Sequence, residues 1–248
     1  QHLESLAPGA QTEALLLSPQ GRVEHAFSGV DDGETFWAHT EHGRGAALAQ
    51  WLDSMRFMMR VEVADVSGEW AVVGLPGLTY DLVPRAELAA YPDRAGNPVG
   101  VWAWEALRIE AGTPRFGLDT DERSIPNEAG WISTVEHPSA VHMDKGCYRG
   151  QETVARIHNL GRPPRRLVLL HLDGSVEHLP PHGSDVTSGD RTVGFVGSSA
   201  RHHELGPIAL ATVKRNVPAD APLLADGVAA AQEVLVDPAV GLHVRPMR

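Results

Sequence analysis

The chain has 248 residues, 42% of them hydrophobic, which allows one large or two modest domains with ordinary cores. Its formal net charge of −11 argues against a strongly basic nucleic-acid surface, so we expect no direct nucleic-acid partner. No apolar run approaches the roughly 20 residues that span a bilayer, and no charged start with an apolar core suggests a signal peptide, so we expect a cytoplasmic protein without membrane contact.

The N-terminal part predicts short strands and one helix. Turn signals at 19–21 and 31–33 separate expected strands at 15–17, 22–27 and 35–38. Between 45 and 60 the apolar residues recur at three- and four-residue steps, which predicts an amphipathic helix with a core-facing stripe of Leu48, Trp51, Leu52, Met55 and Met59. Further strands are expected at 61–66 and 69–75. The order lacks regular βαβ alternation and therefore predicts an α+β domain with an antiparallel sheet.

The remaining elements suggest a second, smaller domain. After a loop at 91–98, a helix is expected at 102–111, with Trp104, Leu107 and Ala111 on one side and Glu105 and Arg108 on another. The connector at 160–166 is basic and rich in proline, so we place a domain boundary there. Strand-like runs at 166–173, 192–196, 208–214 and 229–236 then predict a small barrel.

The only cysteine, Cys147, lies in the segment KGCYRGQE at 145–152. It cannot form an internal disulfide, which leaves a role as nucleophile, redox group or transient ligand. If the segment is extended, Lys145, Cys147 and Arg149 share one face, and both positive charges favour the thiolate. A structural cysteine usually has apolar neighbours, which this one lacks. We therefore predict a reactive Cys147, with Lys145 as its electrostatic partner.

Thirteen histidines raise the question of a metal site. The close pairs lack a companion cysteine or carboxylate at a recognisable ligand spacing; they are His39/His42, His137/His142, His178/His182 and His202/His203. One cysteine likewise cannot hold a four-thiolate iron–sulfur cluster within one chain. We therefore predict no permanent metal site.

Three segments in order resemble one protein family. They are WEALRIEAGTP at 104–114 followed by Gly117 and Asp119, KGCYRGQETVARIHNLGRPPRRL at 145–167, and GFVGSS at 194–199 followed by LGPIALA at 205–211. Together they resemble the YgfZ/GcvT-like folate-binding family, and its YgfZ branch in particular. The resemblance implies an α+β, aminomethyltransferase-like folate-binding region with mainly antiparallel sheets over 1–162 and a C-terminal β-barrel domain over 163–248. It also implies an initial strand and helix before Gln1, which are missing from this sequence.

The resemblance also assigns a cofactor site. It implies that Glu110 contacts the pterin of tetrahydrofolate or a one-carbon derivative, and a carboxylate suits this role because it accepts two parallel hydrogen bonds. The alternative is a salt bridge from Glu110 to Arg108 or another cation. Arg108 is a second candidate for the cofactor site, or scaffold on a different helix face. Tyr148 and Gln151 are candidates for stacking and amide hydrogen bonding, or for packing.

The function implied by the resemblance is that of a folate-binding accessory protein for iron–sulfur cluster assembly or repair, and through it for tRNA-modifying and other iron–sulfur enzymes. Its partners would be the assembly machinery or client enzymes, and we expect a monomer. The alternative is a tetrahydrofolate-dependent aminomethyltransferase of the glycine-cleavage type. Those enzymes place an aspartate pair after a hairpin glycine, where this chain has Glu24 and His25 after Gly21. The difference argues against classical aminomethyltransferase activity.

His25 is nevertheless the residue near this hairpin that is most able to support acid–base chemistry, so we include it among the cofactor-binding candidates. A third alternative is an interaction scaffold in which folate binding is vestigial. Affinity for tetrahydrofolate would separate that scaffold from the other two functions.

Overall fold

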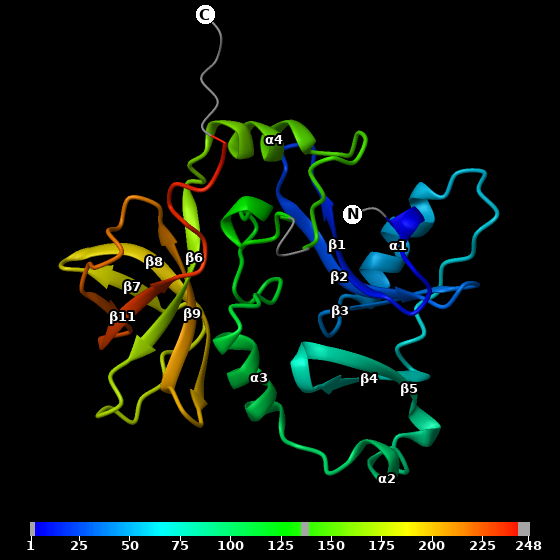
Figure 1. Ribbon diagram of the computed structural model, residues 1–248, viewed down its shortest axis with the longest axis horizontal. Helices are drawn as coiled ribbons and strands as arrows, with labels where there is room; N and C mark the ends of the chain where they lie inside the picture. Colours follow the sequence, from blue (N-terminus) through cyan, green and yellow to red (C-terminus); the bar gives the residue numbers. More distant parts are fainter. Residues whose placement is uncertain (1–2, 135–138, 243–248) are drawn as a thin grey trace, which may run out of the picture.

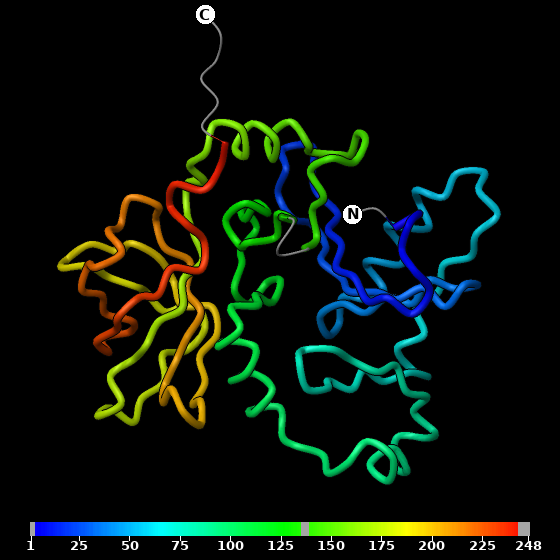
Figure 2. Tube along the Cα trace, in the orientation of Figure 1, coloured from blue at the N-terminus to red at the C-terminus, as the bar shows by residue number. Residues whose placement is uncertain are grey.

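The structure is a computed structural model that describes residues 3–134 and 139–242. It contains a three-stranded sheet, a two-stranded sheet and a closed barrel. Figures 1 and 2 show a central segment, drawn in green, that runs between the barrel on one side and the two small sheets on the other. The predicted α+β class with antiparallel sheets is confirmed. No helix in the described part of the chain is long and apolar enough to cross a membrane.

The three-stranded sheet contains β1 (Gln11–Leu17), β2 (Val23–Asp31) and β3 (Phe36–Thr40), all antiparallel. Helix α1 (Gly45–Met55) follows it. The two-stranded sheet pairs β4 (Trp70–Leu75) with β5 (Thr79–Pro84), a strand that the sequence analysis did not predict. Single turns of 3₁₀ helix occupy Leu3–Ser5, Pro76–Leu78, Arg85–Glu87 and Pro126–Glu128.

The segment after α1 differs from the prediction. The helix ends at Met55 instead of reaching residue 60, and Met59, which we expected in the core, is 61% exposed. The Arg56 side chain bonds Asp53 at 2.8 Å and the carbonyl of Val61 at 3.0 Å, and Phe57 adopts a left-handed φ of 47°, so the chain turns away from the helix axis. The expected strand at 61–66 is also absent, because its backbone pairs with no strand among the described residues.

The central segment carries the short helix α2 (Pro92–Ala95), then α3 (Val101–Glu110), and later α4 (Gln151–Leu160). The buried face of α3 consists of Ala106, Arg108 and Ile109, whereas Leu107 is 39% exposed. The expected common side of Trp104, Leu107 and Ala111 does occur, but it faces a pocket, and a different side of α3 is buried. The apolar surface that α3 covers belongs to the barrel, which the helix periodicity alone does not reveal.

The barrel prediction is confirmed, with six antiparallel strands in the closed order β10-β11-β6-β9-β8-β7. The strands are β6 (Arg165–Leu172), β7 (Asp185–Ser188), β8 (Arg191–His202), β9 (Gly206–Lys214), β10 (Leu223–Ala225) and β11 (Val228–Val234). Successive side chains of β6 alternate between two cores: Val168 and Leu170 fill the barrel, whereas Leu167 and Leu169 pack with Ile109 of α3. This second core fixes α3 against the barrel.

Candidate functional site

Arg108 holds α3 to the barrel from within. All five of its N–H donors are engaged: Nε and Nη2 bond Glu105, Nη1 bonds the carbonyl of Thr113 and Asp119 Oδ2, and Nη2 also bonds Ser198 Oγ at 2.7 Å. A guanidinium with every donor used has none left for a ligand in this arrangement. These bonds are those of a scaffold residue, one of the two roles considered from the sequence, and a cofactor contact of Arg108 stays an untested prediction.

Asp119 is the fully buried partner of this arginine. Its carboxylate lies 3.0 Å from Arg108 Nη1 and accepts hydrogen bonds from Ser198 Oγ and from the backbone N–H of Arg115. Burial raises the pKa of Asp119, and the charge of Arg108 opposes that rise. The side chain of Arg115 extends the network to Glu105 at 2.8 Å and to Glu41 at 2.6 Å. One charge network thus joins α3, the barrel and the loop after β3.

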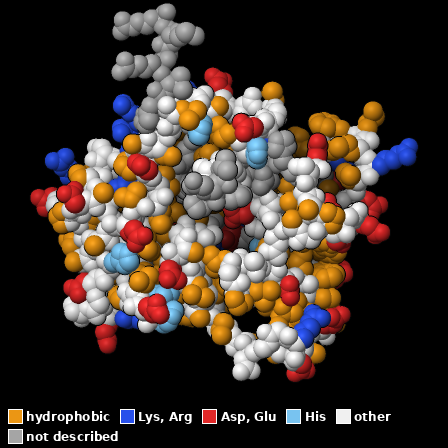
Figure 3. All heavy atoms as spheres, in the orientation of Figure 1, with side chains coloured by type: hydrophobic (Ala, Val, Ile, Leu, Met, Phe, Trp, Pro, Cys, Tyr) orange, Lys and Arg blue, Asp and Glu red, His pale blue; other side chains and the backbone are white. Residues whose placement is uncertain are grey.

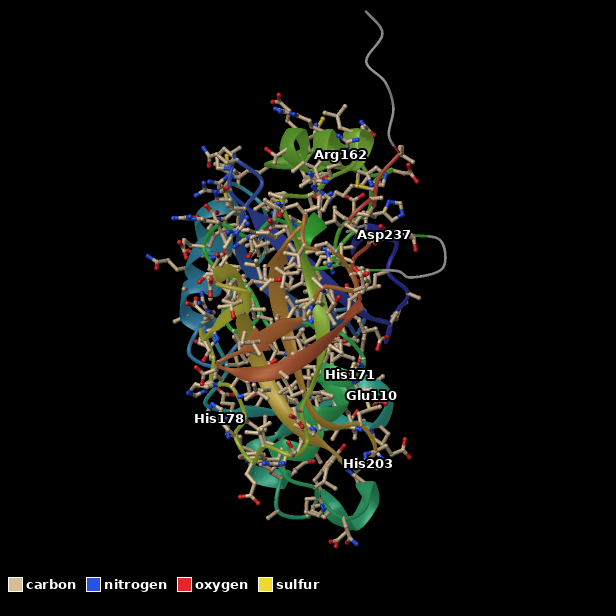
Figure 4. The ribbon with its side chains drawn as sticks, turned by 90° about the vertical axis from the view of Figure 1, so that its left-hand side faces the viewer. Glu110, Arg162, His171, His178, His203 and Asp237 are labelled. Atoms are coloured by element: carbon tan, nitrogen blue, oxygen red, sulfur yellow. The ribbon has the colours of Figure 1, made fainter. Side chains whose placement is uncertain are left out.

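Glu110 ends α3 and is 43% exposed at its side chain. Its Oε2 lies 3.2 Å from Nε2 of His202, whose side chain is only 1% exposed and belongs to the last residue of β8. Glu110 therefore does not pair with Arg108, and the side chain that it faces is a histidine of the barrel. Figure 4 shows Glu110 on the barrel side of the molecule, in the same region as His203.

A pocket of about 310 Å³ opens beside Glu110. Its walls are Leu75, Gly77 and Leu78 at the turn between β4 and β5, and Trp104, Leu107 and Ala111 on α3. The Trp104 ring lies so close to Gly74 of β4 that a Cβ there would meet the ring at 2.8 Å, which fixes the helix against the sheet. Among the described residues, Glu110 is the only ionisable side chain in the wall, so the pocket combines apolar and aromatic surface with one carboxylate.

The KGCYRGQE segment is anchored at a different place, the turn between β1 and β2. Arg149 Nη1 lies 3.3 Å from Glu24 Oε2 on β2. Gly150 adopts a left-handed φ of 79° and packs directly on Ser18 and Gly21, where a Cβ would overlap the carbonyl oxygen of Ser18. The Gln151 side chain accepts a hydrogen bond from the Tyr148 backbone N–H at 2.8 Å. These contacts hold the loop that precedes α4.

Cys147 is exposed within this loop. The segment is a series of turns and irregular backbone, so the extended arrangement with Lys145, Cys147 and Arg149 on one face does not occur. Lys145 Nζ lies 5.6 Å from the centre of the Tyr148 ring, and Arg149 pairs with Glu24. The Tyr148 ring packs at the edge of the core around Trp131 and Val154, and burial raises the pKa of Tyr148. The thiol is accessible, while its basic neighbours also contact other groups.

His25 lies on β2, next to Glu24. Its Nδ1 is buried without a hydrogen-bond partner among the described residues. Burial lowers the pKa of His25, Arg44 lowers it further, and Glu24 opposes both effects. A neutral imidazole at this position can accept or donate a proton.

The predicted residues fall into two groups. Figure 1 places α3, with Arg108 and Glu110, in the lower half of the view, and α4, which begins at Gln151, with the loop that precedes it at the top. Figure 3 shows a hollow in the middle of this face, between the barrel and the N-terminal sheet, with acidic side-chain atoms inside it. The structure therefore separates the Glu110 pocket from the exposed thiol.

Two residues of the Glu110 region received no role from the sequence. Asp119 belongs to a segment of the family resemblance, but only its buried contacts with Arg108 and Ser198 indicate what it does, and Ser198 is 79 residues away along the chain. His202 was considered only as half of a histidine pair, and no local pattern links it to Glu110. Within 3–134 and 139–242 no three His, Cys, Asp or Glu side chains gather as metal ligands. His137 lies outside the described residues.

Comparisons with known proteins match both parts of the chain. Residues 165–235 match the family model described as the C-terminal beta-barrel domain of CAF17. An aminomethyltransferase of Synechococcus elongatus is 31% identical over 164 residues, which cover 61% of this chain and 41% of that protein. The tRNA-modifying protein YgfZ of Cronobacter sakazakii is 29% identical over 145 residues, covering 57% of this chain and 42% of that protein. The chain thus spans about two fifths of the length of these relatives.

A solved structure is similar over nearly the whole chain. It is the crystal structure of glycine cleavage system aminomethyltransferase T from Bartonella henselae, with a TM-score of 0.71 and 16% sequence identity. The match covers 95% of this chain and 77% of that one. At this identity the likeness shows the fold alone, and it confirms the aminomethyltransferase-like fold expected from the sequence.

Proposed function

We propose, on the premise that the chain belongs to the YgfZ/GcvT-like family, that it is a folate-binding accessory protein that supports iron–sulfur cluster assembly or repair in the cytoplasm. Its clients would include tRNA-modifying and other iron–sulfur enzymes. Residues 1–162 would form the folate-binding region and 163–248 the barrel domain, acting together as a monomer. The observation that carries the proposal is the pocket at Glu110, which has one carboxylate in an otherwise apolar and aromatic wall.

The pocket fits the ring system of a folate. A pterin is a flat aromatic group with neighbouring amino and ring N–H donors, and a carboxylate accepts two such donors in parallel. The volume of about 310 Å³ lies at the lower end of the roughly 300–1,000 Å³ of small-molecule sites, so it suits a ring system. Glu110 would bind the ring N–H groups, and Trp104 and Leu107 would exclude water from its faces. When bound, tetrahydrofolate supplies a carrier for one-carbon units.

Two observations favour an accessory role over aminomethyl transfer. Glu24, at one of the positions corresponding to the transferase aspartate pair, pairs with Arg149 of the KGCYRGQE loop, so its carboxylate helps to anchor that loop. Cys147 is exposed, so a partner protein or a cluster can reach its sulfur, and thiolates are the form of cysteine that binds iron or attacks electrophiles. The second candidate function, an aminomethyltransferase, rests on the similarity to the Synechococcus elongatus enzyme.

The experiment compares iron–sulfur enzyme activities in a deletion strain that carries no copy, the wild-type gene, or the Cys147→Ser gene. We expect the wild type to restore the activities and the serine variant to fail at equal protein levels. Full restoration by Cys147→Ser would remove the thiol from the function. Restoration by neither gene would refute the accessory role itself.

A transfer assay decides between the two candidate functions. Purified protein, tetrahydrofolate and aminomethylated carrier protein are mixed, and methylene-tetrahydrofolate is measured. The accessory role predicts no formation at an enzymatic rate, because Glu24 and His25 differ in length and charge from an aspartate pair. Sustained turnover would establish the transferase function instead.

A further inference from the structure

His202 is a buried histidine whose ring caps the turn between β8 and β9. Its Nδ1 accepts hydrogen bonds from the backbone N–H groups of Glu204 at 3.2 Å and Leu205 at 3.1 Å. Two donors that point at Nδ1 require a lone pair there, so this nitrogen carries no proton. The ring is therefore held as the neutral tautomer with its proton on Nε2.

The Nε2–H of this tautomer faces Glu110. The atoms Nε2 and Glu110 Oε2 are 3.2 Å apart, yet Nε2 is buried and its N–H has no well-aligned hydrogen bond among the described residues. With a neutral ring, this contact is a donor facing a carboxylate and not an ion pair. Leaving a buried donor unsatisfied is costly, and the Glu110 carboxylate is an acceptor that a small side-chain rotation would bring into line.

The two side chains come from different parts of the fold. Glu110 ends α3, and His202 ends β8 of the barrel, 92 positions later in the chain. The core between Ala106 and Ile109 of α3 and Ala200 and Ile208 of the barrel fixes these two elements against each other. The position of Nε2 relative to the end of α3 is therefore set by rigid packing.

We propose that His202 is a positioning residue: its Nε2–H holds Oε2 of Glu110 and so fixes the plane of the carboxylate, while each carboxylate oxygen keeps a lone pair for a pterin N–H donor in the pocket. The barrel thereby contributes to the binding site without touching the ligand. This inference rests on the proposed function, since the ligand used to test it is tetrahydrofolate. Residues that hold a ligand-binding group through a hydrogen bond commonly affect affinity by about 10-fold or more, as found for metal sites.

His202→Asn separates the two hydrogen-bonding roles of the ring. The asparagine oxygen can still accept from the turn N–H groups, as in an Asx-turn, but nothing replaces Nε2–H. His203→Asn is the matched control, because that neighbouring ring is exposed and lies tilted against His202, with 4.3 Å between the ring centres. Tetrahydrofolate affinity is measured by calorimetry for both variants, alone and combined with Glu110→Gln.

We expect His202→Asn to weaken binding about 10-fold with little change in Tm, and His203→Asn to leave binding unchanged. In the Glu110→Gln background, His202→Asn should have no further effect, because it acts through that carboxylate. Unchanged affinity in His202→Asn, or an equal loss in both backgrounds, would overturn the proposal.

Nuclear magnetic resonance of protein labelled with ¹⁵N in its histidines tests the contact without ligand. The His202 signals, assigned by their loss in His202→Asn, should show the neutral Nε2–H tautomer, and Nε2 should shift in Glu110→Gln. The inference would be refuted by a proton on Nδ1, or by an Nε2 chemical shift that is the same in the wild type and in Glu110→Gln. If wild-type protein bound no tetrahydrofolate, the proposed function would fail, and these spectra would still decide whether His202 orients Glu110.

Discussion

Replacing Arg108 with methionine tests the buried charge network most severely. The substitution retains a long side chain but removes the cation from Asp119, whose side chain is fully buried. Asp119 would still accept hydrogen bonds from Ser198 Oγ and from the backbone N–H of Arg115. It would lose Arg108, which is the only opposite charge at ion-pair distance from it among the described residues. Breaking a buried ion pair by removing one partner costs about 3–5 kcal/mol, because the other charge remains buried.

The loss is measured by urea unfolding and by calorimetry. In a chain of 150–250 residues each kcal/mol lowers Tm by about 2–4 °C, so Arg108→Met should lower it by roughly 6–20 °C. Arg123→Met is the control: its ion pair with Glu122 is exposed on both sides, at 74% and 80%, and should contribute less than about 0.5 kcal/mol.

The destabilisation by Arg108→Met should also depend on pH. Burial raises the pKa of Asp119 above its ordinary value of 3.8, and loss of the Arg108 charge raises it further. A carboxyl with a raised folded-state pKa destabilises the fold at neutral pH, and that penalty disappears as the pH falls through the folded-state pKa. The difference between wild type and variant should therefore shrink as the pH is lowered from 7 toward 3.8. A loss below about 1 kcal/mol at pH 7, or a difference that grows in acid, would refute the reasoning.

Two further predictions concern the KGCYRGQE loop. Gly150→Ala should destabilise the protein by at least about 2 kcal/mol in urea unfolding, because an L residue is strained at a φ of 79° and its Cβ would overlap the Ser18 carbonyl. Gly146→Ala is the control, because nothing lies within 4 Å of the added Cβ, and it should change stability little. Equal losses of stability in the two variants would contradict this account of the loop. Cys147→Ser should leave Tm almost unchanged, and the native thiol should react with iodoacetamide without denaturant, because it is exposed; protection until unfolding would show that it is buried.

The sequence predicted most accurately the elements whose side chains alternate between a core and another surface. Strand β6 is an example, since Val168 and Leu170 fill the barrel while Leu167 and Leu169 face α3. The same periodicity failed after Met55, where it extended a helix that Arg56 and a left-handed Phe57 end. Hydrophobic spacing does not record such local turns, and it did not reveal the very short strands β7 and β10.

The site was less predictable, because its contacts join distant positions. The charge pattern around Cys147 suggested two cations for the thiolate, yet Arg149 pairs with Glu24, 125 residues earlier. Glu110 was expected from the family resemblance, but the chain offers no signal that its neighbour is His202 and not Arg108. Only the packing of α3 on the barrel brings Glu110 and His202 together.

Calorimetric titration of the wild type and Glu110→Gln with tetrahydrofolate tests the central claim most directly. The account predicts one binding site per chain in the wild type and affinity lower by about 1.5–3 kcal/mol in the variant, the range for a hydrogen bond to a charged group. That corresponds to roughly a 10- to 150-fold increase in Kd. Equal affinities would remove Glu110 and its pocket from folate binding, and the absence of any binding by the wild type would contradict the account as a whole.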